Sequence, residues 1–446
     1  MQQLALGFFG VIFIGGVLLW LPVSNVGGKI PFVDALFTST SAVCVTGLMT
    51  IVPATQFTIF GKAILLMLIQ IGGLGVIACT TTFFIIIGKK ITVRERVVIQ
   101  ETYNLDTLSG MVQLIIKILK GTFIVESIGA VFFSLKFIPE FGIVKGVAFS
   151  IFHAVSAFCN AGIDILGSSS FMEYATNPIV NLTTMGLIIL GGIGFTVWFD
   201  IIKVIYQDSR NKNPHKAVFK RLMLHSKLVI TMTTILIVLG TAVYMLLEWN
   251  NPETIGNMNP LQKLMASGFQ SVTTRTAGFA TISQSGLRED SAFFTCILMF
   301  IGGSPAGTAG GVKTTTVAML LLTGITVLKG KPDTECFGRR IPESNIRTGI
   351  SIIIVSFGAM LMGTMAMSAF EDANFLSILF EAHSALGTVG LSRDLTPTLG
   401  TPSKFVDMML MYIGRIGPVT MALAFGYRKN SKDVLRELPT KRIMVG

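Results

Sequence analysis

Four glycines recur along this chain at a nearly constant interval, and each closes a short apolar segment. The intervals between Gly47, Gly162, Gly278 and Gly390 are 115, 116 and 112 residues. The side chains before these glycines differ, so the four positions share their backbone rather than a reactive group. Rings of carbonyl oxygens can replace the hydration shell of a cation, and glycine permits the backbone angles that such a turn needs. The pattern therefore predicts four equivalent turns that aim carbonyls at one axis.

The predicted coordinating set is each glycine with the two residues before it. Its members are Val45, Thr46 and Gly47, Asn160, Ala161 and Gly162, Thr276, Ala277 and Gly278, and Thr388, Val389 and Gly390. A helix cap or a packing contact would explain one such glycine. Four at a common period favour a shared backbone function.

The amino-acid composition indicates whether these turns lie in a soluble protein or in a membrane protein. Of 446 residues, 51% are hydrophobic and 13% charged, whereas about 25% are charged in a typical soluble domain. This excludes an ordinary cytosolic enzyme. Runs of about 20 apolar residues are long enough to cross a bilayer. Uncharged or nearly uncharged runs lie at 1–28, 63–88, 121–135, 174–199, 228–247, 291–312, 348–370 and 408–427.

Each glycine segment lies between two of these runs, so the chain reads as a fourfold repeat. Two spans per repeat keep all repeats in one orientation, unlike the inverted repeats of many secondary transporters. We predict an all-α polytopic membrane protein with eight transmembrane spans and four re-entrant pore helices, in four parallel span-pore-span repeats around one pore. The expected repeats are 1–100, 101–210, 211–330 and 331–427, followed by a tail at 428–446.

The net charge of +11 indicates topology. The linkers 89–110, 200–221 and 329–347 and the tail from Arg428 hold 21 of the 35 Lys and Arg residues but only 10 acids. By the positive-inside rule these parts are cytoplasmic and the glycine turns face outward. This predicts a multi-pass protein of the cell membrane and argues against a nucleic-acid partner. The uncharged 1–28 lacks a basic signal-peptide start, so it is expected to remain as the first span.

The second span of the third repeat is expected to break. Five glycines at about 1 kcal/mol each and one proline at about 3 kcal/mol oppose a helix there. The break would lie below the glycine turns, where freed backbone could project into the pore; a packing kink is the alternative. The residues of this expected break are Gly302, Gly303, Ser304, Pro305, Ala306, Gly307, Thr308, Ala309, Gly310, Gly311 and Lys313.

A few charged side chains lie within or at the edge of the predicted spans. Arg415 lies within the last span, where a charge is costly and should find a partner. The carbonyls of the expected break are its first candidate partner and Glu126 its second. Lys313 is either a further positive barrier or a side chain that reaches the cytoplasmic surface. Arg275, three residues before Gly278, is expected to point away from the axis toward an acid.

Cofactor chemistry is not indicated. The five cysteines form no CxxC pair and have no histidine at ligand spacing, so neither a disulfide framework nor a zinc site is expected. Residues 73–78 match a dinucleotide-binding pattern but lie in an uncharged span without a preceding strand. The chain is therefore not expected to be an enzyme or to bind a cofactor.

These motifs together resemble the superfamily of K⁺ transporters (Trk, Ktr and HKT), most closely the membrane subunits of bacterial Ktr systems, of the KtrB or KtrD type. The resemblance runs from DALFTSTSAVCVTGL through QIGGLG, FHAVSAFCNAG, LGGIGFTV, TRTAGF and EAHSALGTVG to YIGRIGP. Trk-type relatives generally carry further N-terminal spans, whereas here the first repeat begins almost at Met1. In some plant relatives a serine replaces the first filter glycine and Na⁺ passes, so Gly47 favours K⁺.

The resemblance implies K⁺ uptake through a carbonyl-lined selectivity filter, with a gating loop at 302–313 that Arg415 holds. It also implies a homodimer, a cytoplasmic ring of nucleotide-binding RCK subunits (KtrA or KtrC type) that controls the gate, and Na⁺-dependent uptake. Nucleotide is then expected on the partner, while this chain handles only K⁺ and an activating Na⁺. The alternatives are a symporter coupled to H⁺ or Na⁺, and a Na⁺-permeable relative.

Overall fold

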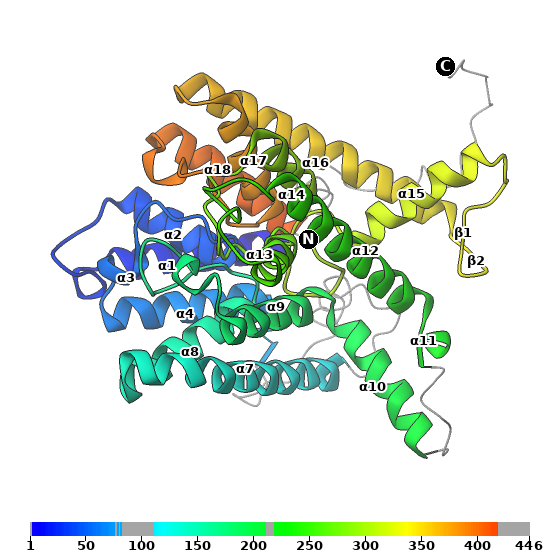
Figure 1. Ribbon diagram of the computed structural model, residues 1–446, viewed down its shortest axis with the longest axis horizontal. Helices are drawn as coiled ribbons and strands as arrows, with labels where there is room; N and C mark the ends of the chain where they lie inside the picture. Colours follow the sequence, from blue (N-terminus) through cyan, green and yellow to red (C-terminus); the bar gives the residue numbers. More distant parts are fainter. Residues whose placement is uncertain (1, 76–77, 80, 83–110, 211–217, 418–446) are drawn as a thin grey trace.

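The computed structural model describes residues 2–75, 78–79, 81–82, 111–210 and 218–417. The described part is mostly helical, and most long helices run broadly along the horizontal axis of Figure 1. Its two strands, β1 (Glu335–Cys336) and β2 (Arg339–Arg340), form a small antiparallel hairpin. The predicted linker 89–110 and the tail 428–446 lie outside the described residues.

The helices follow one another in four groups, and each group contains one helix that ends just before a predicted coordinating segment, called here the short helix of the group. The first group contains α1 (Gln2–Trp20), η1 (Pro22–Ser24), the short α2 (Phe32–Cys44), α3 (Pro53–Gln56) and α4 (Ile59–Leu74). The second contains α7 (Met111–Phe141), the short α8 (Ile143–Phe158), η2 (Met172–Tyr174), α9 (Pro178–Gly192) and α10 (Phe195–Arg210).

The third and fourth groups repeat this order. The third contains α11 (Val218–Arg221), α12 (Leu224–Leu247), the short α13 (Pro260–Thr273), α14 (Glu289–Phe300) and α15 (Thr314–Leu328). The fourth contains α16 (Glu343–Phe370), the short α17 (Phe375–Gly387), η4 (Thr396–Thr398) and α18 (Thr401–Ile416).

Contacts between the groups close a ring. The helix that follows each short helix packs against the short helix of the next group: α4 on α8, α9 on α13, α14 on α17 and α18 on α2. The last contact joins the fourth group to the first. The four short helices therefore surround one axis, although contacts such as Lys404 to Asp34 join residues that lie 370 positions apart in the chain.

The starts of the short helices and their neighbours follow from local sequence signals. The Asn177, Asn374 and Thr58 side chains accept hydrogen bonds from the first turns of α9, α17 and α4. Asn259 and Gln262 form a reciprocal capping box at the start of α13. Each cap satisfies backbone donors that would otherwise lack a partner at a helix start.

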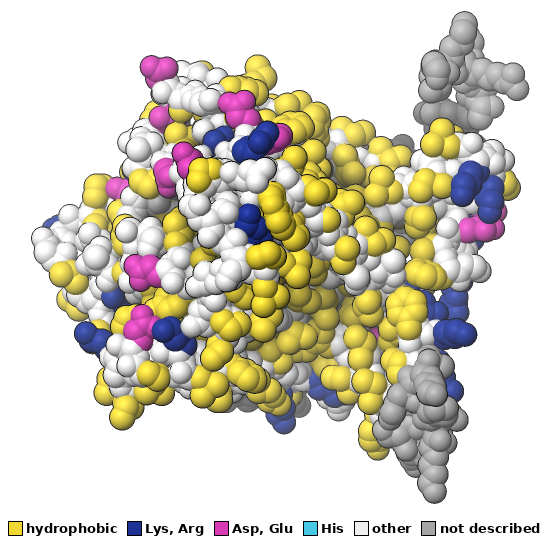
Figure 2. All heavy atoms as spheres, in the orientation of Figure 1, with side chains coloured by type: hydrophobic (Ala, Val, Ile, Leu, Met, Phe, Trp, Pro, Cys, Tyr) yellow, Lys and Arg dark blue, Asp and Glu magenta, His cyan; other side chains and the backbone are white. Residues whose placement is uncertain are grey.

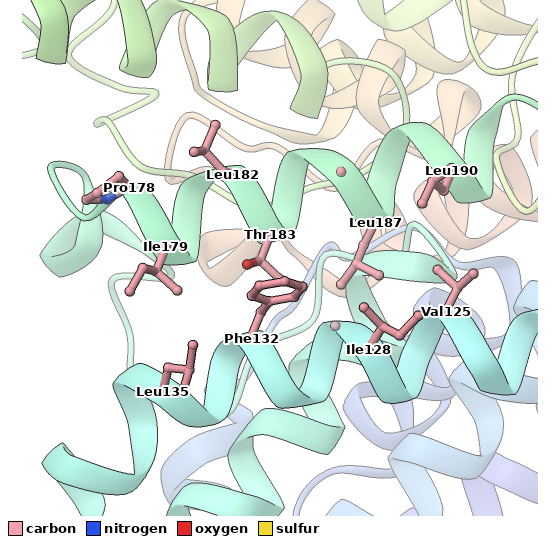
Figure 3. Close-up of a pocket in the computed structure, with 12 residues that line it drawn as sticks. Val125, Ile128, Phe132, Leu135, Pro178, Ile179, Leu182, Thr183, Leu187 and Leu190 are labelled. Atoms are coloured by element: carbon pink, nitrogen blue, oxygen red, sulfur yellow. The ribbon is translucent and has the colours of Figure 1, made fainter.

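The core and the outer surface are both apolar. Phe37, Phe158, Phe269 and Phe380, one from each short helix, are fully buried. On the outside, many large hydrophobic side chains are exposed, as the yellow surface of Figure 2 shows. One surface groove of about 510 Å³ lies between α7 and α9, and only apolar side chains and Thr183 line it (Figure 3). Such a surface is typical of a protein that faces lipid.

Only some helices are long enough to span a bilayer by themselves. Within the described residues, α12 and α16 meet this test by length and apolarity, and the bent pair of α9 and α10 makes a third candidate. Several of the predicted spans are instead interrupted. α4 ends at Leu74, α9 at Gly192 and α18 at Ile416, although the sequence predicted continuous spans at 63–88, 174–199 and 408–427.

The interruptions have one physical cause. Gly75, Gly194 and Gly417 each adopt a positive φ, of 88°, 92° and 94°, just beyond these helix ends. Such a φ ends an α-helix and is readily available only to glycine. Between α9 and α10 the chain direction turns by 95°. The predicted spans were drawn from apolarity alone, which does not register a helix end inside an apolar run.

Candidate functional site

Each short helix ends in a backbone of unusual conformation at the predicted coordinating set. Val45, Asn160, Thr276 and Thr388 all adopt a left-handed conformation, with φ of 57°, 60°, 66° and 51°. Two residues later, Gly47, Gly162, Gly278 and Gly390 have φ of 102°, 64°, 80° and 92°. The same conformation thus recurs at the same two positions of all four segments. A β-branched residue with positive φ is a real outlier, and such strain clusters at functional sites.

The four glycines meet in a closed ring. A Cβ placed on Gly47 would lie 2.6 Å from the carbonyl oxygen of Ala161, one on Gly162 2.5 Å from that of Ala277, and one on Gly278 2.6 Å from that of Val389. A Cβ on Gly390 would overlap the carbonyl oxygen of Thr46, which returns to the first segment. Each glycine therefore lies beside a carbonyl of the next segment, and no side chain fits between them.

Hydroxyl groups within the short helices hold each segment. The backbone N–H groups of Gly47 and Gly390 donate to Ser41 Oγ (2.9 Å) and Ser384 Oγ (3.0 Å). In the second segment Ser156 Oγ donates to the carbonyl of Ile163 (2.6 Å). All three serines were visible in the sequence as the residue six positions before the glycine.

In the third segment a threonine takes the place of the serine that holds the other three. Ser271 donates to the carbonyls of Leu236 and Ile237 in α12, away from the segment. Thr273 Oγ1 donates to the carbonyl of Phe279 instead (2.6 Å). Thr273 was missed because it lies five residues before Gly278 rather than six.

A hollow of about 220 Å³ opens directly beside the ring. Its lining includes all four ring glycines together with Asp164 and Asp394. Burial raises the pKa of Asp164 to about 6, while the N–H of Leu166, 3.2 Å away, stabilises the charged carboxylate. Acidic side chains at such a mouth raise the local concentration of cations.

The expected break in the third group is present. α14 ends at Phe300 and α15 begins at Thr314, so residues 301–313 form a loop, called here the α14–α15 loop. The loop folds back on itself because the N–H of Gly302 donates to Val312 (2.9 Å) and the N–H of Thr314 to Gly303 (3.0 Å). Ser304 Oγ and Thr314 Oγ1 share a further bond of 2.8 Å.

The α14–α15 loop lies against two of the glycine segments. Thr308 Oγ1 donates to the carbonyl of Phe158 (3.0 Å) and lies 3.3 Å from Asn160 Oδ1. A Cβ on Gly310 would overlap Thr388 Oγ1, so the loop backbone touches the fourth segment as well. The loop is thereby placed at the ends of the short helices.

The bend after α9 accommodates this loop. The N–H groups of Ser304 and Thr308 donate to the carbonyls of Gly192 (2.9 Å) and Gly191 (3.1 Å), and the N–H of Phe195 donates to Ala306 (2.8 Å). These three backbone hydrogen bonds therefore join the loop to the interrupted α9–α10 junction. The glycines of the GGIG sequence indicate a helix end at this junction. The apolar run that contains them nevertheless resembles one continuous span.

Arg415 joins the α14–α15 loop to the first group. Its guanidinium donates to the carbonyl of Thr308 in the loop and to the carbonyls of Gly72 and Gly73 at the end of α4. A planar guanidinium with five donors suits such a bridge. Of the two predicted partners, the loop carbonyl is the one in contact, because Glu126 instead accepts bonds from Gln70 and Cys159.

Two other cations are placed by the structure. Lys313 Nζ turns back to the loop carbonyls of Ala309 (2.8 Å) and Gly310 (3.4 Å). Arg275 donates to Thr233 Oγ1 of α12 (3.3 Å). The expectation of an acidic partner for Arg275 is therefore wrong within the described residues, because α12 presents a hydroxyl at that place.

The described residues contain no group of three or more His, Cys, Asp or Glu side chains that could hold a metal ion. The five cysteines are free thiols. The polar features that converge are backbone carbonyls, two cationic side chains and the acids of the mouth. This arrangement suits the passage of a cation better than a chemical reaction.

Comparison with known proteins identifies relatives of the whole chain. A family model described as TrkH, cation transport protein, matches residues 9–434. The chain is 41% identical over 430 residues to Ktr system potassium uptake protein B of Bacillus subtilis, covering 96% of this chain and 94% of the relative. It is 40% identical to potassium/sodium uptake protein NtpJ of Enterococcus hirae, covering 100% and 97%.

The fold has a known counterpart as well. The crystal structure of the potassium transporter TrkH from Vibrio parahaemolyticus superposes with a TM-score of 0.74 at 18% identity, covering 94% of this chain and 83% of that one. At this level of identity the match concerns the fold. These relatives are cation transporters rather than enzymes.

Proposed function

This chain belongs to the TrkH family of cation transport proteins, and we propose that it is the K⁺-translocating membrane subunit of a Ktr-type uptake system. The relative that is 41% identical to this chain is named for potassium uptake, which supports this assignment. The single observation that carries the mechanism is the closed ring of four left-handed segments whose glycines lie beside neighbouring carbonyls.

The proposed filter consists of the predicted coordinating set at 45–47, 160–162, 276–278 and 388–390. Its support is the recurrence of one backbone conformation in four segments that differ in side chains. Positive φ at two alternate residues of each segment lets the carbonyls turn to one side, so a dehydrated K⁺ can exchange water for backbone oxygen. The acids Asp164 and Asp394 at the mouth attract cations to it.

The proposed architecture is that of eight spans and four re-entrant helices in four parallel repeats, at 1–100, 101–210, 211–330 and 331–427. The order of helices in the four groups supports these limits. Interrupted inner helices do not oppose it, because non-helical backbone is tolerated at membrane depth where it lines a cavity. Basic side chains of the β1–β2 hairpin lie at the right in Figure 2 and most visible acids toward the left, which supports cytoplasmic linkers.

The proposed gate is the α14–α15 loop with Arg415. Residues 302–311 and Lys313 lie across the ends of the short helices, and Arg415 ties Thr308 to α4. Opening requires these bonds to break, so a regulator that moves α14, α15 or α18 would control flux. We expect that regulator to be a cytoplasmic ring of RCK subunits acting on a homodimer, as the name of a Ktr system implies a partner.

Two features of transport remain for experiment: Na⁺ dependence and coupling. The relative named for potassium and sodium uptake favours a Na⁺-permeable alternative. A symporter coupled to H⁺ or Na⁺ is the other alternative. A K⁺ current that follows voltage alone, without accompanying H⁺ or Na⁺ movement, would exclude coupling.

The decisive measurement is K⁺ and Na⁺ flux in proteoliposomes and in a host that lacks K⁺ uptake, with and without a co-expressed RCK subunit. We expect K⁺ uptake that the regulator increases and that Na⁺ stimulates. Absence of K⁺ flux from well-inserted protein in both settings would refute the proposal. Na⁺ flux equal to K⁺ flux would favour the Na⁺-permeable alternative.

A further inference from the structure

Two buried carboxylates lie behind the fourth glycine segment, outside the proposed pathway. Glu381 is in the middle of the short helix α17, and Asp407 is in the first half of α18, which packs against α17. Both side chains are 0% exposed. An isolated buried charge is expensive unless it is paired or coordinates an ion.

The two carboxylates differ in how well they are satisfied. Glu381 accepts hydrogen bonds from the hydroxyls of Ser392 (2.7 Å) and Thr396, both in the loop that follows Gly390. Asp407 has no hydrogen-bond partner on either carboxylate oxygen within the described residues. A carboxylate with two bare oxygens in a closed interior is rare, because buried polar groups are almost always bonded.

A third oxygen shares this condition. Ser403 is 0% exposed, and its Oγ also has no partner in the described part of the chain. Ser403 precedes Asp407 by four residues in α18, so both side chains lie on the same face of the helix. Three unsatisfied oxygens thus lie on one buried face of α18, the helix that packs against the α17 helix carrying Glu381.

The surrounding charges are of one sign. The charged groups that act on Asp407 are Glu381 first and Glu371 second, and Asp394 acts on Glu381. The nearest cation in the sequence, Lys404, is committed elsewhere because its Nζ pairs with Asp34 Oδ1 of α2 at 2.7 Å. The cluster therefore has a deficit of positive charge as well as free oxygens.

We propose that Asp407, Ser403 and Glu381 form a binding site for a dehydrated monovalent cation, with Na⁺ as its occupant, behind the fourth filter segment. Carboxylate and hydroxyl oxygens are the ligands that hard cations take in proteins. A divalent ion fits less well, since Ca²⁺ takes six to eight oxygens and Mg²⁺ retains water. The hydroxyls of Ser392 and Thr396 link the site to the segment that ends at Gly390.

This site would be the structural basis of the proposed Na⁺ dependence. Its role in transport therefore rests on the proposed function. Binding itself is measured without flux, so a failure of the site and a failure of the proposed function are distinguishable. A proton shared between two neighbouring carboxylates is the rival explanation. It would leave the protein indifferent to Na⁺.

The test is the melting temperature of the purified full-length protein in lipid nanodiscs at fixed KCl. NaCl is titrated against choline chloride at constant ionic strength, and CaCl2 is tested separately. A ligand that binds only the folded state raises the melting temperature as its concentration passes the Kd.

We compare the wild type with Asp407→Asn, Ser403→Ala and Glu248→Gln. Glu248 is the matched control, since it is also 0% exposed but its oxygens bond Asn251, Thr254 and the N–H of Arg288.

We expect a saturable rise with Na⁺ in the wild type and in Glu248→Gln. In Asp407→Asn the half-saturating Na⁺ concentration should increase at least about tenfold, which corresponds to about 1.4 kcal/mol. Ser403→Ala should increase it less and keeps the site testable if Asp407→Asn does not fold. The proposal is overturned by a wild type that responds equally to Na⁺ and choline, by an unchanged half-saturation in both variants, or by stabilisation with Ca²⁺ alone.

Discussion

At the scale of single residues, the four non-glycine positions with left-handed backbone are the strongest indication of function. Val45, Thr276 and Thr388 are β-branched, and each such conformation costs about 1–3 kcal/mol. The surrounding hydrogen bonds hold them in place. Because the conformation recurs in all four segments, a local accident of packing does not explain it, and its recurrence supports the proposed filter.

The first prediction concerns a ring glycine. Gly47→Ser places a side chain against the carbonyl of Ala161 at a backbone φ of 102°. We expect the ring to distort and K⁺ over Na⁺ discrimination to fall about tenfold, equivalent to about 1.4 kcal/mol. The measurement is the ratio of K⁺ to Na⁺ flux in proteoliposomes. Gly358→Ser is the control, because nothing lies within 4 Å of that position; an unchanged ratio in Gly47→Ser would count against the filter.

The second prediction concerns a hydroxyl that holds the ring. Ser41→Ala leaves the partly buried N–H of Gly47 without its acceptor, and a fully buried donor that loses its acceptor costs about 1–3 kcal/mol. We therefore expect a lower melting temperature. Ser127→Ala, which removes an exposed hydroxyl bonded to its own helix, should change the melting temperature little. Equal effects of the two substitutions would contradict the bracing role of Ser41.

At the scale of elements, the α14–α15 loop and the ends of α4, α9 and α18 act together. Interrupted helices expose carbonyls at Gly72, Gly191 and Gly192, and these carbonyls bind Arg415 or the loop. A continuous α-helix would have used them internally. The loop is thus held by the helix ends that border it, and its release depends on a few hydrogen bonds.

The third prediction is a gain of flux on removing this loop. Deletion of Ser304 to Gly310 takes away the residues that contact Asn160 and Thr388. We expect K⁺ flux to rise several-fold in protein that is inserted at the wild-type level, as measured by ion uptake into proteoliposomes. Unchanged flux would indicate that the loop is a packing kink rather than a gate.

The fourth prediction separates charge from geometry at Arg415. Arg415→Gln removes the bridge between Thr308 and Gly72, whereas Arg415→Lys keeps the charge but not the planar fork of donors. Both variants should raise K⁺ flux, because neither can bind both carbonyls in the wild-type geometry. Arg347→Gln, which breaks an exposed ion pair with Glu343, should not. Wild-type flux in Arg415→Lys would show that charge alone suffices.

At the scale of the whole molecule, four helix groups close into a ring that buries four phenylalanines and faces an apolar surface outward. The basic side chains of the β1–β2 hairpin lie at the right in Figure 2, whereas most of the acidic side chains visible there lie toward the left. This separation of charge is what the positive-inside rule requires of a membrane protein. The membrane would then surround the ring, with the mouth at one end and the cytoplasmic regulator at the other.

The fifth prediction tests that orientation. Cysteine at Glu253, in the loop between α12 and α13, should react with a membrane-impermeant maleimide in intact cells. Cysteine at Lys331, between α15 and β1, should react only after lysis. Both positions are exposed, and four of the five native cysteines are buried, so the unsubstituted protein supplies the background. The reverse pattern of labelling would contradict the proposed topology.

The sequence alone determined the family, the fourfold period and the place of the helix break, because glycine spacing and apolar runs are local signals. It did not reveal the interruptions after α4, α9 and α18, since an apolar run looks the same whether or not its backbone remains helical. Nor did it assign Thr273 to the third segment or Thr233 to Arg275. Only the tertiary structure decided which carbonyls face Arg415 and, within the part of the chain that it describes, left the side-chain oxygens of Asp407 and Ser403 without hydrogen-bond partners, because these relations join residues that are distant in the chain and depend on how helices pack.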